Sequence, residues 1–236
     1  MPLKRPSSIM SRWKARWAET RVSLRKLGLE APPATVSPPW SRARAVEFEQ
    51  EMGYLLPGSL REFFRVCASS IVCSYETPDA IAPTLSERPR FTFEGYLSIS
   101  AGAIAPLSSL MVEWSKDIEK ERGSIPERYR FACPVGCVDP DEPISFGIVC
   151  VDRRSQFDGR VFIATREDLC TSEETHVADS VFDYIDVITD LVYWKPGRWL
   201  KELDFYENQG HRIDRTSQAA RERRVAFGLP AVPDRG

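Results

Sequence analysis

Residues 46–67 read VEFEQEMGYLLPGSLREFFRVC, and this stretch decides the fold. Its first half places Phe48 and Met52 on one helical face, while the glutamates between them form a polar face. Gly53 suits the left-handed conformation that commonly ends a helix. The second half repeats apolar residues at i, i+3, i+4 and i+7, namely Leu60, Phe63, Phe64 and Cys67. The stretch therefore predicts two short amphipathic helices joined at a Leu-Pro step.

The same motif carries a family resemblance. An acidic helix ending in Gly-Tyr, then Leu-Pro, then a helix beginning Ser-Leu-Arg-Glu-Phe-Phe resembles the N-terminal signature of the SUKH superfamily, which contains bacterial immunity proteins and fungal regulators of cell-wall synthesis. The match is good over residues 44–68 and looser over 126–192. In the family the later part forms a strand hairpin and an amphipathic helix, here Ser145–Asp152, Arg160–Thr165 and Thr175–Val192. Where family members often carry Asn-Gly after the second helix, this chain has Ala68-Ser69-Ser70.

The chain as a whole has an ordinary globular composition. It has 236 residues, of which 42% are hydrophobic, and no run of about 18 apolar residues that would span a membrane. No apolar segment follows the basic N-terminus, so we expect no secretory signal and a cytoplasmic location. Helices among a few antiparallel strands predict a single α+β domain, in which a small antiparallel sheet is packed with several helices. We expect a basic helix over residues 1–30 packed on the core, the SUKH-like body over 31–205, and a basic, partly helical tail over 206–236.

Periodicity predicts the remaining elements. They are a helix over residues 8–28, a Pro-rich linker or extended arm over Ala31–Pro39, an irregular stretch over 71–90, a strand over Phe91–Ile99, a helix over Pro106–Glu121, a strand over Arg128–Cys133 with Tyr129, Phe131 and Cys133 inward, and a tail helix over Arg215–Phe227.

The six cysteines do not indicate a metal site. They form no CxxC pair, and Cys133 and Cys137 form a CxxxC pair with no further ligand pair at suitable spacing. Buried free thiols are the expected state, and we predict no metal and no cofactor.

Charge is segregated along the sequence. Residues 1–44 carry ten Lys or Arg and two acids, residues 212–236 carry six and three, and residues 45–211 carry a net charge of −13. We expect the basic tail helix to pack rather than to contact nucleic acid, because no aromatic-rich reader module accompanies it. Whether the basic ends pack on the acidic middle or project away stays open at this stage.

A row of aspartates gives the candidate binding surface. Asp179, Asp183, Asp186 and Asp190 follow at spacings of four, three and four, on a helix whose buried stripe includes Ile185. Like charges at these spacings destabilise a helix by a few tenths of a kcal/mol per pair. We therefore expect either an acidic docking surface or a solvated face favoured in part by the helix dipole. The second candidate is the exposed loop VDPDEP, which supplies the acids Asp139, Asp141 and Glu142.

Nothing in the sequence supports catalysis. The chain has two histidines, His176 and His211, and lacks both the GxSxG nucleophile elbow and a phosphate-binding GxxxxGK[ST] loop. His176 has acidic neighbours that would favour its charged, exposed form.

The resemblance and the acidic row together predict a non-catalytic immunity protein. It would occlude a cognate bacterial toxin of a polymorphic toxin system, expected to be a basic nuclease, through protein–protein interaction with its acidic surface. We expect no membrane partner, no small-molecule substrate and no nucleic acid. The alternative is a regulatory scaffold that binds several host proteins without a toxin partner. A third hypothesis is nucleic-acid association through residues 1–30 and 212–236.

Overall fold

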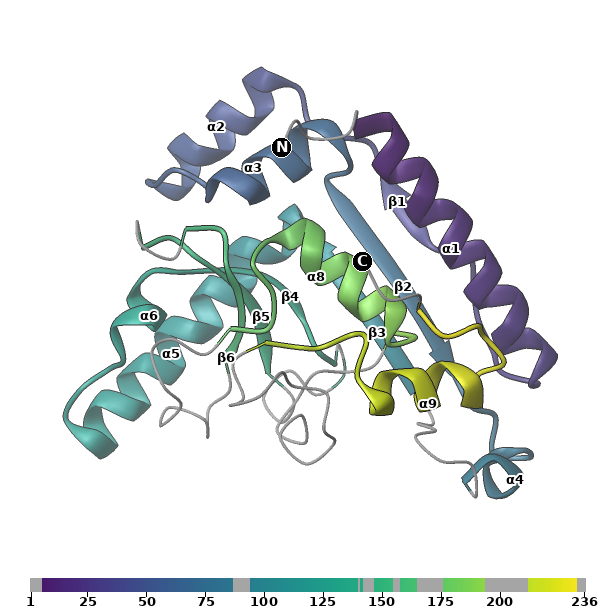
Figure 1. The fold of residues 1–236 in the computed structure, drawn as a ribbon. Helices are drawn as coiled ribbons and strands as arrows, with labels where there is room; N and C mark the ends of the chain where they lie inside the picture. The colour runs from purple at the N-terminus through teal and green to yellow at the C-terminus, as the bar shows by residue number, and fades with distance from the viewer. Residues whose placement is uncertain are drawn as a thin grey trace.

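The computed structural model describes residues 6–86, 94–139, 141, 147–154, 158–164, 176–193 and 212–232. The helices are α1 (Pro6–Lys26), α2 (Arg42–Met52), α3 (Gly58–Val66), α4 (Ala82–Ser86), η1 (Ala101–Ala103), α5 (Ile104–Arg122), α6 (Glu127–Arg130), α8 (Val181–Asp190) and α9 (Gln218–Ala226). The strands are β1 (Thr35–Ser37), β2 (Ser70–Glu76), β3 (Glu94–Ser100), β4 (Ala132–Cys137), β5 (Ile148–Asp152) and β6 (Val161–Ala164). Figure 1 shows α1 along one side of the molecule and α5 on the other.

The strands form two antiparallel sheets, ordered β1-β2-β3 and β4-β5-β6. The sheets adjoin at β3 and β4, where a Cβ atom placed on Gly136 would lie 2.2 Å from the backbone oxygen of Ser98. The predicted α+β class is therefore confirmed, and the predicted hairpin of β5 and β6 is present.

The two helices of the Leu-Pro motif form as the sequence predicts. Gly53 ends α2 with a φ of 72°, and the apolar face of α3 is buried. Glu49 is buried instead of lying on a polar face. One of its carboxylate oxygens accepts the backbone N–H of Leu56 at 3.0 Å, and the other pairs with Arg61 at 3.1 Å. A buried carboxylate therefore fixes the turn between the helices.

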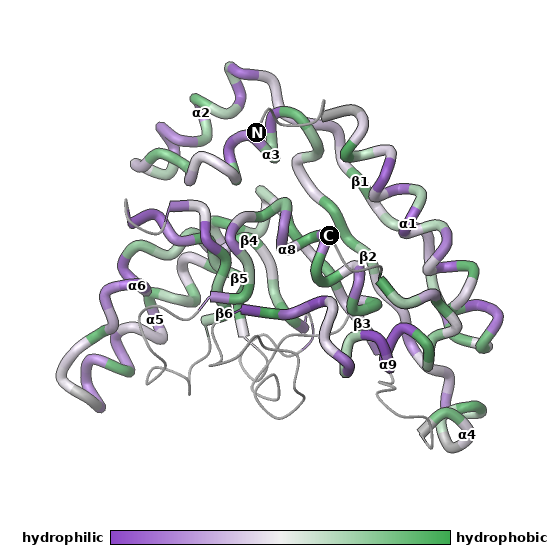
Figure 2. The backbone as a smooth tube through the Cα atoms, viewed as in Figure 1, coloured by the Kyte–Doolittle hydropathy of each residue, from purple (hydrophilic) through white to green (hydrophobic). Residues whose placement is uncertain are grey.

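The hydrophobic core has two parts. The larger part joins α1, α3 and α8, where the ring centroids of Trp13 and Phe63 lie 6.4 Å apart and Ile185 is fully buried. The smaller part lies between α5 and the second sheet, and includes Trp114 and Phe162. Figure 2 shows hydrophilic and hydrophobic residues alternating along α1, as expected for a helix that buries one face.

Helix α8 ends in an unusual backbone conformation. Val192 and Tyr193 both have positive φ, at 54° and 52°, which bulky residues rarely adopt. The Tyr193 carbonyl accepts the backbone N–H of Tyr96 in β3 at 2.6 Å, while the buried side chain of Arg223 donates to the Leu191 and Val192 carbonyls. Helix α9 and strand β3 thus hold the end of α8 in place.

Two predicted segments are wrong. Residues 71–90 include most of β2 and all of α4, so the stretch is not irregular throughout. Residues 127–130 form α6 instead of a strand, and Phe131 is exposed at 39% instead of pointing inward. The predicted linker or extended arm over 31–39 contains the short strand β1, so the extended alternative is the correct one at these residues. The first residues of the predicted strand Phe91–Ile99 lie outside the described residues.

Among the described residues, no helix combines the length and apolar character needed to cross a bilayer.

The close approach of the two sheets gives a stability prediction. Gly136→Ala is expected to lower the free energy of unfolding by about 2–3 kcal/mol, because its Cβ would meet backbone atoms of Ser98 that cannot move aside. Gly102→Ala is the matched control, since its Cβ would approach no atom closer than 3.6 Å. Urea unfolding of both variants measures the difference. Equal stabilities would show that β3 and β4 are not packed this closely.

Candidate functional site

The aspartate row does not form one solvent-facing surface. Asp186 is 8% exposed and lies beneath α1. Its carboxylate accepts a hydrogen bond from the Trp13 indole at 2.9 Å and pairs with Arg12 at 2.9 Å and Arg16 at 2.6 Å. All three donors come from one face of α1.

Asp190, one turn further along α8, is 5% exposed. It pairs with arginine side chains from both terminal segments of the chain. Arg16 of α1 pairs with one carboxylate oxygen. Arg215 pairs with the other at 3.2 Å, and Arg224 of α9 approaches to 3.7 Å. Burial lowers the pKa of the Arg224 guanidinium, and the charge of Asp190 counters that effect. We call these groups, with Asp186 and Arg12, the α8 ion-pair network.

The expectation of an exposed docking row is therefore wrong for Asp186 and Asp190. The physical reason is that the basic terminal segments pack on the acidic middle and supply its counter-ions. Asp183 and Asp179 both pair with Arg212, at 3.1 and 2.8 Å, but the Asp179 side chain remains half exposed. Asp179, with Asp183 beside it, is the part of the row that a partner can still reach.

The second acidic candidate, the loop that carries Asp139, Asp141 and Glu142, is only partly exposed in the described residues. Asp139 is 4% exposed, so the expectation of an exposed acid is wrong at this position. Its carboxylate accepts the backbone N–H of Asp141 at 3.0 Å, as a turn-forming aspartate does. Asp141 is exposed, and Glu142 lies outside the described residues.

A groove beside the Leu-Pro turn has the chemistry of a binding surface. Its volume is about 380 Å³, and its lining includes Tyr54 from the turn, Met111 and Val112 from α5, and Arg153 from the end of β5. We call it the Tyr54 groove. It joins three segments that are far apart in the sequence.

Arg153 is held in this groove by stacking. Its guanidinium carbon lies 4.0 Å from the centroid of the Tyr54 ring and 6.0 Å from that of Phe131. One of its terminal nitrogens donates to the Arg130 carbonyl at 3.1 Å, whereas its Nε has no hydrogen-bond partner in the described part of the chain. The Tyr54 hydroxyl lies 3.7 Å from the Cys133 sulfur. The Tyr54 ring and the Arg130 carbonyl thus fix the orientation of the Arg153 guanidinium at the surface.

Large apolar side chains are exposed at this groove and in the turn that leads to it. Val112 lines the groove and is 53% exposed, Phe131 lies beside Arg153, and Leu55, which follows Tyr54 in the sequence, is 72% exposed. Exposed apolar residues gathered in one place are typical of an interaction surface, whereas single ones are common on any protein.

Tyr54 of the groove and the buried Cys133 thiol beside it both have raised pKa values. Burial raises the pKa of the Tyr54 hydroxyl well above its usual value, and burial also raises the pKa of Cys133 to about 11. Both groups are therefore neutral near pH 7, and the thiol has little nucleophilic character.

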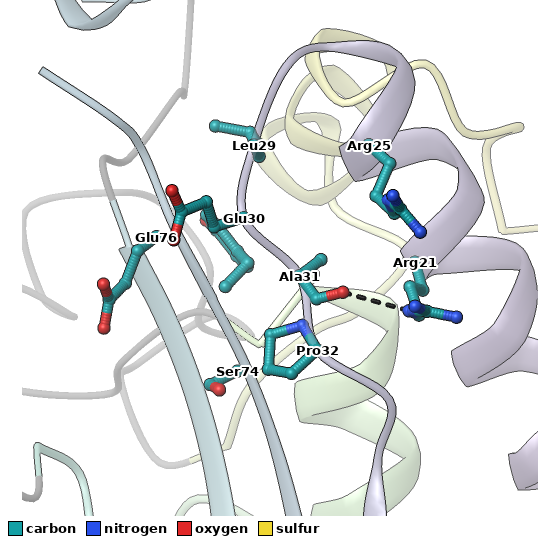
Figure 3. Close-up of a pocket in the computed structure, with 9 residues that line it drawn as sticks. Arg21, Arg25, Leu29, Glu30, Ala31, Pro32, Ser74 and Glu76 are labelled. Carbon is teal, nitrogen blue, oxygen red and sulfur yellow. Dashed lines mark hydrogen bonds between the residues drawn. The ribbon is translucent and has the colours of Figure 1, made fainter.

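A second pocket, of about 520 Å³, lies between α1 and β2 (Figure 3). Arg21 and Arg25 line one side, and Glu30 and Glu76 line the other. The Nε of Arg21 donates to the Ala31 carbonyl at 3.0 Å. Its walls therefore carry charges of opposite sign, and one arginine also braces the chain.

The histidines do not assemble a catalytic group in the described residues. The Nε2 atom of His176 lies 3.0 Å from the Asp179 carboxylate, and its side chain is mostly buried instead of exposed. His211 lies outside the described residues. Within the same part of the chain, no cluster of three or more His, Cys, Asp or Glu side chains could hold a metal ion.

No protein-family model matches this chain. No curated protein and no solved structure matches it significantly. The resemblance to SUKH proteins therefore depends on residues 44–68 and on the order of the later elements.

The α8 ion-pair network predicts that the loss of one carboxylate strongly destabilises the folded protein. Asp186→Ala is expected to lower the free energy of unfolding by about 3 kcal/mol, because it removes the ion pairs of Asp186 with Arg12 and Arg16 and leaves the buried Trp13 N–H without its acceptor. Glu47→Ala is the control, since Glu47 pairs with Arg44 in solvent and its loss costs about 0.5 kcal/mol or less. Chemical denaturation of both variants gives the comparison, and equal losses would contradict the buried network.

The raised pKa of Cys133 predicts an alkaline loss of stability. The thiol ionises near pH 9 in an unfolded chain but only near 11 when buried, so its contribution to stability is complete below pH 9 and is lost as the pH rises towards 11. The free energy of unfolding should fall over this range, and Cys133→Ala should make the fall shallower. Urea unfolding at pH 8, 9.5 and 10.5 measures both slopes; identical slopes would mean that Cys133 ionises freely in the folded protein.

Proposed function

We propose that this chain is a non-catalytic immunity protein that binds and neutralises a cognate bacterial toxin. The observation that carries the proposal is the set of exposed apolar side chains around the Tyr54 groove, next to the motif that resembles SUKH proteins. A toxin held against this face would be blocked by occlusion, without any reaction catalysed by the chain.

The arrangement of the elements supports the SUKH-like part of the proposal. The order of two helices, a strand hairpin and a later amphipathic helix is the order that the resemblance implies. Helix α8 packs against α3, the second helix of the motif. The apolar face of α3 thus lies in the core, while Tyr54 of the Leu-Pro turn lines the groove.

The composition of the groove supports a protein partner. Tyr54 and Arg153 belong to residue types that dominate the energetics of protein interfaces, and here each holds the other in place. Met111 on the groove wall can adapt to different partner surfaces. We assign the tight contacts to this face, and to Asp179, Asp183 and Asp141 a supporting electrostatic role.

Co-expression with a toxin encoded beside this chain tests the proposal. The wild-type chain is expected to restore growth of cells that make the toxin and to co-purify with it. Leu55→Asp is expected to weaken toxin binding at least tenfold without loss of stability, because Leu55 is 72% exposed and a charge there would be buried on binding.

Val225→Asp is the matched control, since Val225 is 65% exposed on α9 and should tolerate the charge with toxin binding unchanged. Failure of the wild-type chain to protect cells would contradict an immunity function. Co-purification with several host proteins instead of a toxin would favour the regulatory scaffold.

A further inference from the structure

We infer that the Tyr54 groove receives an acidic apolar segment of the partner protein, in which a large apolar side chain is flanked by carboxylates. This inference rests on the proposed protein-binding function and specifies the chemistry of the bound segment. It also differs from the partner expected from the sequence, since a basic toxin surface would approach acids.

The floor of the groove is apolar. Met111 and Tyr129 belong to the smaller part of the core, between α5 and the second sheet. Ile125 packs against that part and also lines the groove. The volume of about 380 Å³ lies within the range of roughly 300–1,000 Å³ found for small-molecule sites. It is therefore large enough for one bulky apolar side chain.

The rim of the groove is basic. Its ionisable residues other than tyrosine are Lys116, Arg130 and Arg153, with Glu119 as the acid. None of the three cations forms a salt bridge within the described part of the chain. By contrast Arg154, the next residue after Arg153, is buried and pairs with Asp152 at 2.7 Å. The groove thus keeps a net positive charge that the molecule does not neutralise in the described residues.

Arg153 is prepared to bind a carboxylate. Stacking on Tyr54 and the bond to the Arg130 carbonyl restrict the guanidinium before any partner arrives, so little side-chain entropy is lost on binding. A planar guanidinium matches the geometry of a carboxylate, and the pair is stronger at a surface that excludes water. A lysine or arginine from a partner would instead face like charge, which is costly in a desolvated interface.

Three blocked tetrapeptides test this inference with the full-length chain and no toxin. They are acetyl-Asp-Leu-Phe-Asp-amide, the matching peptide with Asn at both ends, and the matching peptide with Lys at both ends. Binding is followed by NMR chemical-shift changes of groove residues and by the fluorescence of Trp114, which is buried in the same part of the core.

The acidic peptide is expected to bind at least tenfold more tightly than the lysine peptide, with the asparagine peptide between them and the differences reduced in high salt. Arg153→Met should remove most of the acidic preference, whereas Arg25→Met on α1 should leave it unchanged. Equal affinities, tighter binding of the lysine peptide, or no change at groove residues with any peptide would each overturn the inference. Because no toxin is present, these outcomes are independent of whether the chain protects cells.

Discussion

The fold depends on the burial of two aspartates of α8 against arginines that come from opposite ends of the chain. Asp186 and Asp190 can be buried as ions only because Arg16, Arg215 and their neighbours are placed around them. Both termini are therefore tied to the same helix, and α8 connects α1, α3 and α9. The basic segments near the two ends of the chain thus pair with the acidic residues of α8 in the folded protein.

This arrangement changes where a partner can bind. An acidic row that carries its own counter-ions generates a weaker field, so the strongest electrostatic feature expected from the sequence is largely neutralised inside the molecule. The Tyr54 groove combines an apolar floor, exposed apolar side chains and cations that form no salt bridge in the described residues. We therefore place the recognition face beside the Leu-Pro turn, where Met111 and Tyr129 of the smaller part of the core line the groove. Tyr54 itself packs against the larger part, which also holds Ile185 of α8.

The sequence predicted the elements whose apolar spacing is regular. The faces of α3, α5 and α8 and the hairpin of β5 and β6 follow directly from periods of 3.6 and 2 residues. It failed where periodicity is weak, as at Arg128 and Tyr129, which alternate like a strand but form one helical turn after Pro126. Spacing also shows which aspartates share a helical face but not what covers that face, and here the cover is α1, about 170 residues earlier in the chain. No local sequence pattern could predict the groove, because Tyr54, Met111 and Arg153 come together only in the folded chain.

A double-mutant cycle between Arg16 and Asp186 tests the central claim most directly. The free energy of unfolding would be measured by urea denaturation for the wild-type chain, Arg16→Met, Asp186→Asn and the double variant. If Arg16 and Asp186 form a buried ion pair between α1 and α8, the stability losses of the two single variants are not additive. The expected coupling energy is about 1.5 kcal/mol or more. A coupling energy below about 0.3 kcal/mol would contradict the account, because it would mean that the two side chains do not interact in the folded protein.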